Sequence, residues 1–297
     1  MSHYKKPALS ITDQIALLEQ RGMAVTDKKL AEQTLKVCNL YRFNGYALHF
    51  WINPSTRPQQ YRSGTRFEDV LNLMNLDREL RLLTLDAIER LEVAVRSAIT
   101  SEASLYYGSP HWYLERTVFK DWARYQQFLT QATKDFQRSR EIFAEHYKVK
   151  YTEPPLPPSW VLAEISTFGT WSHLFENLKE RKLRNQIARV FQISHEQLQS
   201  NLHILNNTRN LCAHHSRLWN RIFTFTPSLC QAKGVSIPVL DHRSYAAQAG
   251  MIWVMLRAIE PSSHWTKELH SLIAEYTIEP KEMGFKPGWE HDPFWNI

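Results

Sequence analysis

Cysteine, glycine and long apolar runs are all scarce in this chain of 297 residues. Its three cysteines, Cys38, Cys212 and Cys230, are too few and too scattered for a disulfide framework, so we expect reduced thiols and a cytoplasmic protein. Only nine glycines argue against a fold rich in strands and tight turns. The apolar run at 251–256 is too short to cross a bilayer, and the first residues lack a signal peptide's apolar stretch. We therefore expect neither secretion nor membrane insertion.

Common catalytic motifs are also missing. The sequence has no Gly-rich Walker loop, no G-x-G-x-x-G, no G-x-S-x-G and no H-E-x-x-H. These absences remove most nucleotide-dependent enzymes, α/β-hydrolases and zinc proteases from consideration. No repeat with a period of 20–50 residues is found, which argues against a solenoid.

The overall composition is that of a globular, mildly basic protein. Hydrophobic residues make up 43% and charged residues 22%, and Lys plus Arg exceed Asp plus Glu by 36 to 30, a formal charge of +6. This excess favours a polyanionic partner without proving one, since a solvated basic surface has the same composition. The 10 Trp and 12 Tyr suit either a large core or base stacking.

Apolar residues recur with helical spacing along the whole chain, which predicts an all-α, multi-helix fold. The longest periodic stretch contains no Gly or Pro, and its Asp77 and Arg81, four residues apart, are typical of a solvated face. The pattern breaks around Gly45, and the tail from 277 looks irregular. We expect helices over 11–21, 27–40, 67–107, 121–147, 160–168, 171–178, 182–191, 196–219, 245–259 and 264–276.

The proline-rich stretch 153–158 is the best candidate for a domain boundary, because it cannot be helical. It would divide the chain into an N-terminal helical region, 1–152, which carries the long helix 67–107, and a C-terminal helical region, 153–297. A stiff loop inside one continuous domain is the alternative.

One segment, 197–240, contains no Asp or Glu. A carboxylate there would repel a phosphate and pair with nearby arginines, so its absence favours a phosphate ligand. The basic and imidazole side chains of this segment are Arg209, Arg217, Arg221, Lys233, His203, His214 and His215.

A helical projection divides this segment into two faces. Arg209 begins closer to the apolar face, but its long side chain can reach the polar one. Asn210 and His214 are one turn apart, so their side chains lie over one another. The apolar face carries Leu198, Leu202, Leu205 and Cys212, and the polar stripe carries His203, Asn206, Asn210, His214 and Arg217.

Arginine, asparagine and histidine together can cleave RNA without a metal or cofactor. The 2′-hydroxyl is the nucleophile, a histidine transfers protons, an arginine stabilises the phosphate, and an asparagine orients either one. One helix supplies one such histidine, and a dimer would supply the second. The bland alternative is a packed or surface pair. His203, His214, His215 and Cys212 could bind a structural zinc, but their spacing in the sequence matches no recognisable four-ligand pattern.

Residues 208–221, TRNLCAHHSRLWNR, resemble the core motif of the Abi-like family. These are abortive-infection proteins of bacteria, of the AbiD/AbiF type, within the HEPN superfamily, whose motif is Arg, four to six residues, then His. Arg209, Asn210 and His214 match that motif. The resemblance covers roughly 5–260 and includes segments 6–10 with Gln14, 41–46, 67–70 with 77–81, 87–93 and 157–170.

The resemblance implies an all-α fold with a HEPN-type helical core and a metal-independent endoribonuclease whose composite site lies across a homodimer. It also implies phage defence or toxin–antitoxin biology, with a small RNA restraining some relatives. Arg209 would bind the phosphate, His214 would act as general base or acid, and Asn210 would position one of them. We expect RNA contacts from His215, Arg217, Arg221, Asn206 and Arg42.

Other readings remain open. The basic stripe can belong to a catalytically silent module that holds a small structured RNA. Helix 67–107 can form a dimer seam in an interaction scaffold, or simply be buried in its own domain. The aromatic residues of 41–46 can pack in the core instead of serving RNA. Nucleotide transfer through a partner enzyme is a further alternative, although this chain has no nucleotidyltransferase pattern.

Overall fold

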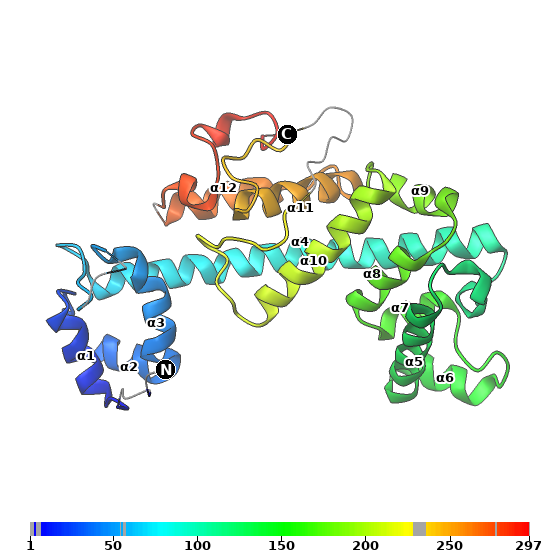
Figure 1. Cartoon of the computed structure of the whole chain (residues 1–297), viewed down its shortest axis with the longest axis horizontal. Coiled ribbons are helices and arrows are strands. Elements are labelled where there is room, and N and C mark those ends of the chain that lie inside the picture. The colour runs from blue at the N-terminus through cyan, green and yellow to red at the C-terminus, as the bar shows by residue number, and fades with distance from the viewer. Residues whose placement is uncertain are drawn as a thin grey trace. The chain divides into compact units, whose positions relative to one another are not determined.

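The computed structural model describes residues 3, 7–53, 55, 58–227, 236–276 and 278–296. Over these residues it contains twelve α-helices, short 3₁₀ helices and isolated bridges but no strand, so the all-α prediction is confirmed (Figure 1). Lys6, Cys230 and Lys233, which the sequence analysis singled out, lie outside the described residues.

The helix bounds mostly follow the predicted ones. The twelve helices are α1 (Ile11–Gln20), α2 (Lys28–Cys38), α3 (Leu40–Ala47), α4 (Phe67–Tyr107), α5 (Trp122–Arg138), α6 (Ile142–Lys150), α7 (Ser159–Ile165), α8 (Phe168–Asn177), α9 (Arg181–Arg189), α10 (His195–Ala213), α11 (Tyr245–Ile259) and α12 (Trp265–Glu275).

The first compact unit, residues 1–79, holds α1, α2, α3 and the beginning of α4. The predicted break around Gly45 is wrong, because Gly45 lies inside α3. The interruption falls at Asn39, whose φ of +53° ends α2 and whose side chain accepts a hydrogen bond from the Arg42 amide at 2.9 Å. Phe43 is fully buried in this unit and stacks on Phe67 at 4.5 Å between ring centroids.

The long helix α4 begins and ends where the sequence predicts, since no Gly or Pro interrupts it. The expected solvated face at Asp77 and Arg81 is wrong, because both side chains are buried. Asp77 accepts a hydrogen bond from the Tyr46 hydroxyl at 2.7 Å, which helps to compensate for the burial of its charge. The division between the two compact units falls within this helix, after residue 79.

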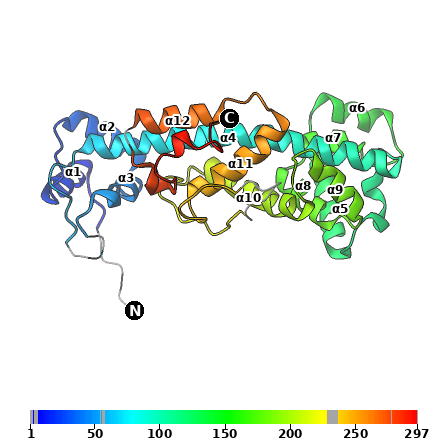
Figure 2. The ribbon, with the colours of Figure 1, turned by 90° about the horizontal axis from the view of Figure 1, so that it is seen from above.

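In the second unit, residues 80–297, α4 packs beside α10, α11 and α12 (Figure 2). The Thr84 hydroxyl contacts the Tyr245 hydroxyl at 3.0 Å, and the Trp265 indole donates to the Leu83 carbonyl at 2.9 Å. Fully buried side chains from these helices, among them Trp253, fill the space between them. These contacts fix the helices on which the Arg–His motif rests.

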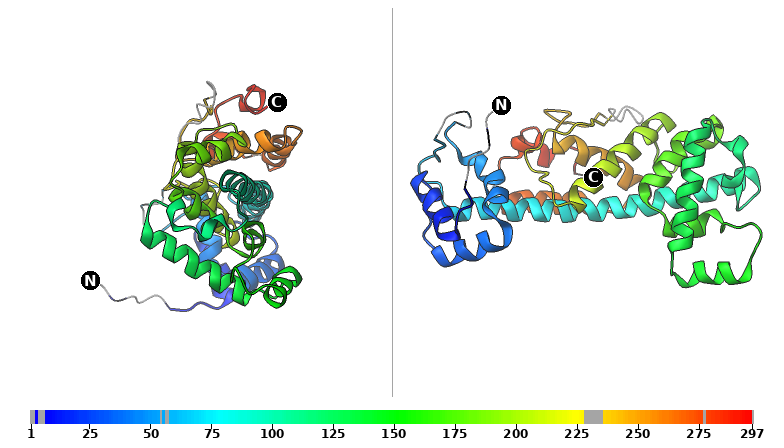
Figure 3. Two further views of the ribbon diagram at one scale, coloured as in Figure 1. Left: turned by 90° about the vertical axis from the view of Figure 1, so that its right-hand side faces the viewer. Right: turned by 60° about the horizontal axis from the view of Figure 1, so that its bottom comes forward.

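Helices α5–α8, coloured green in Figure 3, form the rest of this unit with α9. The predicted single helix 121–147 is wrong, because the backbone is extended at Ser139 and Glu141. Lys148 stabilises this break by donating to the Ser139 carbonyl at 2.8 Å. The proline-rich stretch lies within the second unit, where the Tyr147 hydroxyl donates to the Pro154 carbonyl at 3.0 Å. The division into regions 1–152 and 153–297 stays a prediction.

The aromatic residues build a core. Six tryptophans are fully buried. The tail is irregular, as expected, apart from short 3₁₀ turns. It packs on the rest of the second unit through the buried Trp295 and through its Phe294 carbonyl, which accepts a hydrogen bond from the Trp253 indole of α11 at 2.9 Å. Of the helices described, none combines the length and apolarity that crossing a membrane requires.

Candidate functional site

Helix α10 carries the candidate site, and its start is as predicted. Ser194 caps it through a capping box, in which the Gln197 amide donates to Ser194 Oγ at 3.2 Å and the Ser194 amide donates to Gln197 Oε1 at 3.0 Å. The predicted apolar face is buried, with Leu198, Leu202 and Leu205 fully enclosed. That burial fixes the rotation of the helix and turns the opposite stripe outward.

The end of α10 differs from the prediction, which extended the helix to about residue 219. Helix geometry stops at Ala213, with His214 as the C-cap residue. The His215 amide donates to the Cys212 carbonyl at 2.9 Å and the Ser216 amide to the Leu211 carbonyl at 2.8 Å, while His215 has a φ of +56°. These features define a Schellman motif with histidine where glycine is usual.

The three motif residues lie together at this helix end. Arg209 is exposed, and its Nη1 donates to Asn210 Oδ1 at 3.4 Å. The His214 amide donates to the Asn210 carbonyl at 2.9 Å, which holds the histidine directly after the last turn. The exposed imidazole of His214 has no hydrogen-bond partner within the described part of the chain, so a ligand can reach it.

A carboxylate that the sequence analysis missed contacts Arg209. Glu92, on α4, places Oε1 at 3.5 Å from Arg209 Nε, and Arg96 Nη2 lies 3.4 Å from Glu92 Oε2. Burial raises the pKa of Glu92 above its usual value, while the two arginines and Glu89 act on it more weakly. The stretch 197–240 contains no acidic residue, but Glu92 of α4 lies next to it in the folded protein. Only the packing of α10 on α4 reveals this contact.

The loop after α10 is anchored by buried residues and carries two of the expected RNA contacts. Leu218 and Trp219 are fully buried. The Arg217 guanidinium lies over the Trp219 ring at 6.0 Å from its centroid, and Arg221 Nη1 donates to the Arg217 carbonyl at 3.3 Å. Because the helix ends early, Arg217 does not extend the polar stripe of α10, and that part of the prediction is wrong.

The buried Arg81 of α4 also supports this loop. Its Nη1 donates to the Ser216 carbonyl at 3.5 Å, beside the Schellman motif. The sequence had suggested a solvated role for this arginine. The position of Arg81 within a long apolar repeat was a signal that its side chain could be buried and donate to a backbone carbonyl. Nothing in the sequence identifies Ser216 as the residue that supplies this carbonyl.

The remaining expected contacts fall in different places. Asn206 lies on the polar stripe of α10, with its amide about 3.5 Å from the position that a Cβ on Gly169 would take. His215 is exposed next to His214. Arg42 lies on α3 in the first unit, and its contact with RNA stays a prediction.

Metal ligation is not supported by the arrangement of donors. Cys212 lies on the buried face of α10, whereas His214 and His215 are exposed, and the His203 ring packs edge-on against Phe225 at 4.4 Å between centroids. Within the described residues, no three His, Cys, Asp or Glu side chains are grouped to hold an ion. The expected absence of metal and cofactor remains a prediction.

Comparison with known proteins identifies the family. A family model described as Abi-like protein matches residues 33–220, which is more than half of the chain and runs from α2 through the Arg–His motif. No curated protein and no solved structure matches the chain significantly. Because the match is this extensive and includes Arg209, Asn210 and His214, the chain belongs to the Abi-like protein family.

Proposed function

We propose that this protein is a metal-independent endoribonuclease of a bacterial abortive-infection or toxin–antitoxin system. The observation that carries the proposal is the group of Arg209, Asn210 and His214 at the C-terminal end of α10, in which Arg209 and His214 are exposed. Membership of the Abi-like family suggests abortive-infection defence. The basic, acid-poor segment around the group favours a polyanion such as RNA.

The chemistry follows from the three side chains. The 2′-oxygen of a ribose attacks the adjacent phosphorus and loses its proton to a base, while the bond from phosphorus to the 5′-oxygen breaks and that oxygen gains a proton. Arg209 holds the phosphate and stabilises the charge that grows on its oxygens. His214 transfers a proton, and Asn210 holds the Arg209 guanidinium in place. The products are a 2′,3′-cyclic phosphate and a 5′-hydroxyl.

Two proton transfers are served best by two histidines, and this motif supplies one His214 per chain. We therefore propose a homodimer in which a second copy of α10 faces the first, so that one imidazole acts as base and the other as acid. The exposure of His214 and Arg209 in one chain leaves both side chains accessible to such a partner.

A second candidate function is an RNA-binding module without turnover, which would hold a small structured RNA. The ion pair between Glu92 and Arg209 favours it, because a paired guanidinium is less available to a scissile phosphate. In the nuclease, an incoming phosphate has to displace Glu92 from Arg209.

Cleavage of single-stranded RNA by the purified protein in EDTA tests the proposal. We expect the wild-type protein to cleave and His214→Ala to leave the RNA intact. His242→Ala, which replaces another exposed histidine of the second unit, is the matched control and should cleave normally. Full cleavage by His214→Ala would remove this residue from the mechanism, and intact RNA with the wild-type protein would favour the silent module.

A further inference from the structure

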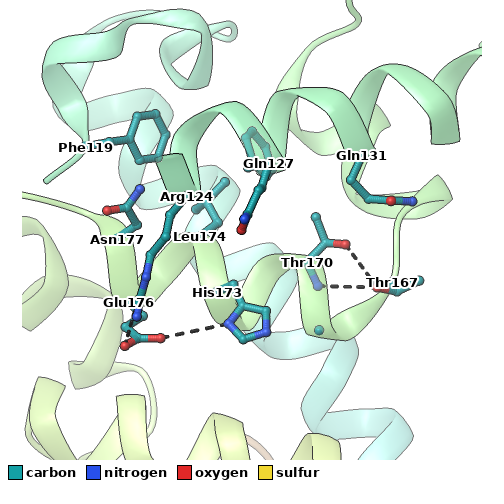
Figure 4. Close-up of a pocket in the computed structure, with 12 residues that line it drawn as sticks. Phe119, Arg124, Gln127, Gln131, Thr167, Thr170, His173, Leu174, Glu176 and Asn177 are labelled. Atoms are coloured by element: carbon teal, nitrogen blue, oxygen red, sulfur yellow. Dashed lines mark hydrogen bonds and ion pairs between the residues drawn. The ribbon is translucent and has the colours of Figure 1, made fainter. Parts of the chain in front are cut away.

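We infer that the hollow between α5 and α8 binds one nucleobase of the RNA strand held at α10, an inference that rests on the function proposed above. This α5–α8 pocket has a volume of about 660 Å³, within the range of sites that take small ligands. Figure 4 shows side chains from both helices turned toward the space between them.

The inner surface of the α5–α8 pocket is apolar and aromatic. Phe119 and Phe128 line it and are almost fully buried, and Leu174 lies beside them. Their rings are 6.3 Å apart between centroids. These side chains give the pocket an apolar floor, which favours contact with a flat base with little dependence on which base it is.

The rim of the pocket is lined by neutral groups that can both donate and accept hydrogen bonds. Gln127 extends from α5 into the pocket, and its amide has no hydrogen-bond partner within the part of the chain that is described (Figure 4). Gln131 donates from Nε2 to Asp135 at 2.9 Å, and the Thr170 hydroxyl contacts that of Thr167 at 3.0 Å. Amides and hydroxyls complement the mixed donors and acceptors on the edge of a base.

The charges of the pocket argue against a phosphate as its ligand. Glu176 lies between two basic side chains, with Oε1 at 2.8 Å from Arg124 Nη1 and Oε2 at 3.9 Å from His173 Nδ1. The carboxylate neutralises the arginine and would repel a phosphate brought beside it. An uncharged, flat ligand with polar edges fits this setting, and a base has those properties.

The pocket adjoins the stripe that leads to the motif. His173 also lines a second hollow, to which α10 contributes His203. Gly169, on the wall of the α5–α8 pocket, lies against the side chain of Asn206. Asn206 and His214 are eight residues apart, about 12 Å along a helix. A single strand with its scissile phosphate at the motif can therefore place a nearby base in the pocket.

Hydrogen bonds hold the two walls of the pocket together before any ligand arrives. The Asp121 amide donates to Asn177 Oδ1 at 2.8 Å, and Asn177 Nδ2 donates to the Asp121 carbonyl at 3.1 Å. These bonds tie the start of α5 to the end of α8. A preformed site of this kind loses little conformational entropy when it binds.

Abasic scanning of a bound RNA tests the inference. The full-length His214→Ala protein, which leaves RNA intact, is titrated with oligonucleotides of about 12 nucleotides that each lack one base. We expect one abasic position to weaken binding about tenfold, because the apolar contacts of the base and its hydrogen bonds to Gln127 are lost together. Gln127→Leu in the same protein should reduce this penalty to about twofold or less. Gln126→Leu, an exposed neighbour outside the pocket lining, should leave it unchanged.

Photocrosslinking locates the same base. With 4-thiouridine at the sensitive position, we expect the crosslinked peptide to come from 122–138 or 166–177. Crosslinks confined to α10 and the following loop, or equal abasic penalties in Gln127→Leu and Gln126→Leu, would overturn the inference while leaving RNA cleavage intact. Protein that binds no RNA would overturn both. Saturable binding of AMP that Gln127→Leu weakens, without RNA crosslinks at α5 or α8, would assign the pocket to a free nucleotide and refute the RNA-strand proposal.

Discussion

The contact between Glu92 and Arg209 predicts that removing one negative charge from α4 strengthens RNA binding. Glu92→Gln preserves the shape of the side chain and its hydrogen-bonding capacity but removes the charge that holds Arg209 Nε at 3.5 Å. In the variant, the guanidinium no longer has to leave a carboxylate in order to bind a phosphate. We expect higher affinity for single-stranded RNA.

The magnitude follows from the distance and the exposure of the pair. Two unit charges 3.5 Å apart interact by about 5 kcal/mol at an effective dielectric constant of 20. The Arg209 side chain is 46% exposed, so solvent screens the pair and its net contribution falls to about 1 kcal/mol. That free energy corresponds to an RNA dissociation constant about fivefold lower.

The assay is RNA binding at low salt with His214→Ala as the parent protein, so that no substrate is lost. Glu89→Gln is the matched control, because this substitution removes the same charge from the same helix. Glu89 is exposed and lies about one turn from Glu92. We expect Glu92→Gln to bind about fivefold more tightly than the parent and Glu89→Gln to change affinity by less than about twofold. Equal effects of both variants, or weaker binding by Glu92→Gln, would refute the reasoning.

The same substitution has a pH signature in stability. Burial is the largest cause of the raised pKa of Glu92, so the folded protein binds this proton more tightly than the unfolded chain. The corresponding stability is present below the ordinary glutamate pKa and is lost as pH rises through the folded-state pKa. The unfolding free energy of Glu92→Gln relative to wild type should therefore increase between acidic and neutral pH, as urea titrations can measure. If the unfolding free energy of Glu92→Gln relative to wild type fell as pH rose over this range, the pKa of Glu92 would not be raised in the folded protein.

Two backbone positions yield further predictions. At His215, whose φ is +56°, a β-branched residue is strained and glycine is not. The unfolding free energy of His215→Val, measured in urea, should therefore be about 1–2 kcal/mol lower than that of His215→Gly. Equal unfolding free energies would refute the strain at this position. At Gly250, a Cβ would lie 2.3 Å from Ile237 Cγ2, so Gly250→Ala should destabilise the protein by about 1–3 kcal/mol. That cost should fall when Ile237→Ala is also present, and an undiminished cost in the double variant would exclude the clash as its cause.

Elements with unambiguous local signals were predictable from sequence. The long helix α4 follows from an uninterrupted apolar repeat, and the start of α10 follows from Ser194 and Gln197, whose spacing is that of a capping box. The motif residues Arg209, Asn210 and His214 were found because the spacing of Asn210 and His214 places them on one helix face and because all three match a family pattern. In the structure, Arg209 Nη1 donates to Asn210 Oδ1, a contact that the sequence analysis did not predict.

Features that depend on packing or on unusual backbone geometry were not predictable. The end of α10 was missed because His215, and not glycine, takes the left-handed position. The break between α5 and α6 was missed because no Gly or Pro marks it; Lys148, which caps α5 from the next helix, becomes visible only in the fold. Glu92 was missed for a similar reason, since sequence spacing does not specify which residues of α4 face α10.

The chemical nature of the RNA ends tests the central claim most directly. Wild-type protein and His214→Ala are incubated with a labelled single-stranded RNA in EDTA, and the termini of the products are analysed. The account predicts 2′,3′-cyclic phosphate and 5′-hydroxyl ends with wild-type protein and no new ends with His214→Ala. Products with 3′-hydroxyl and 5′-phosphate ends, or RNA left intact by the wild-type protein, would contradict it.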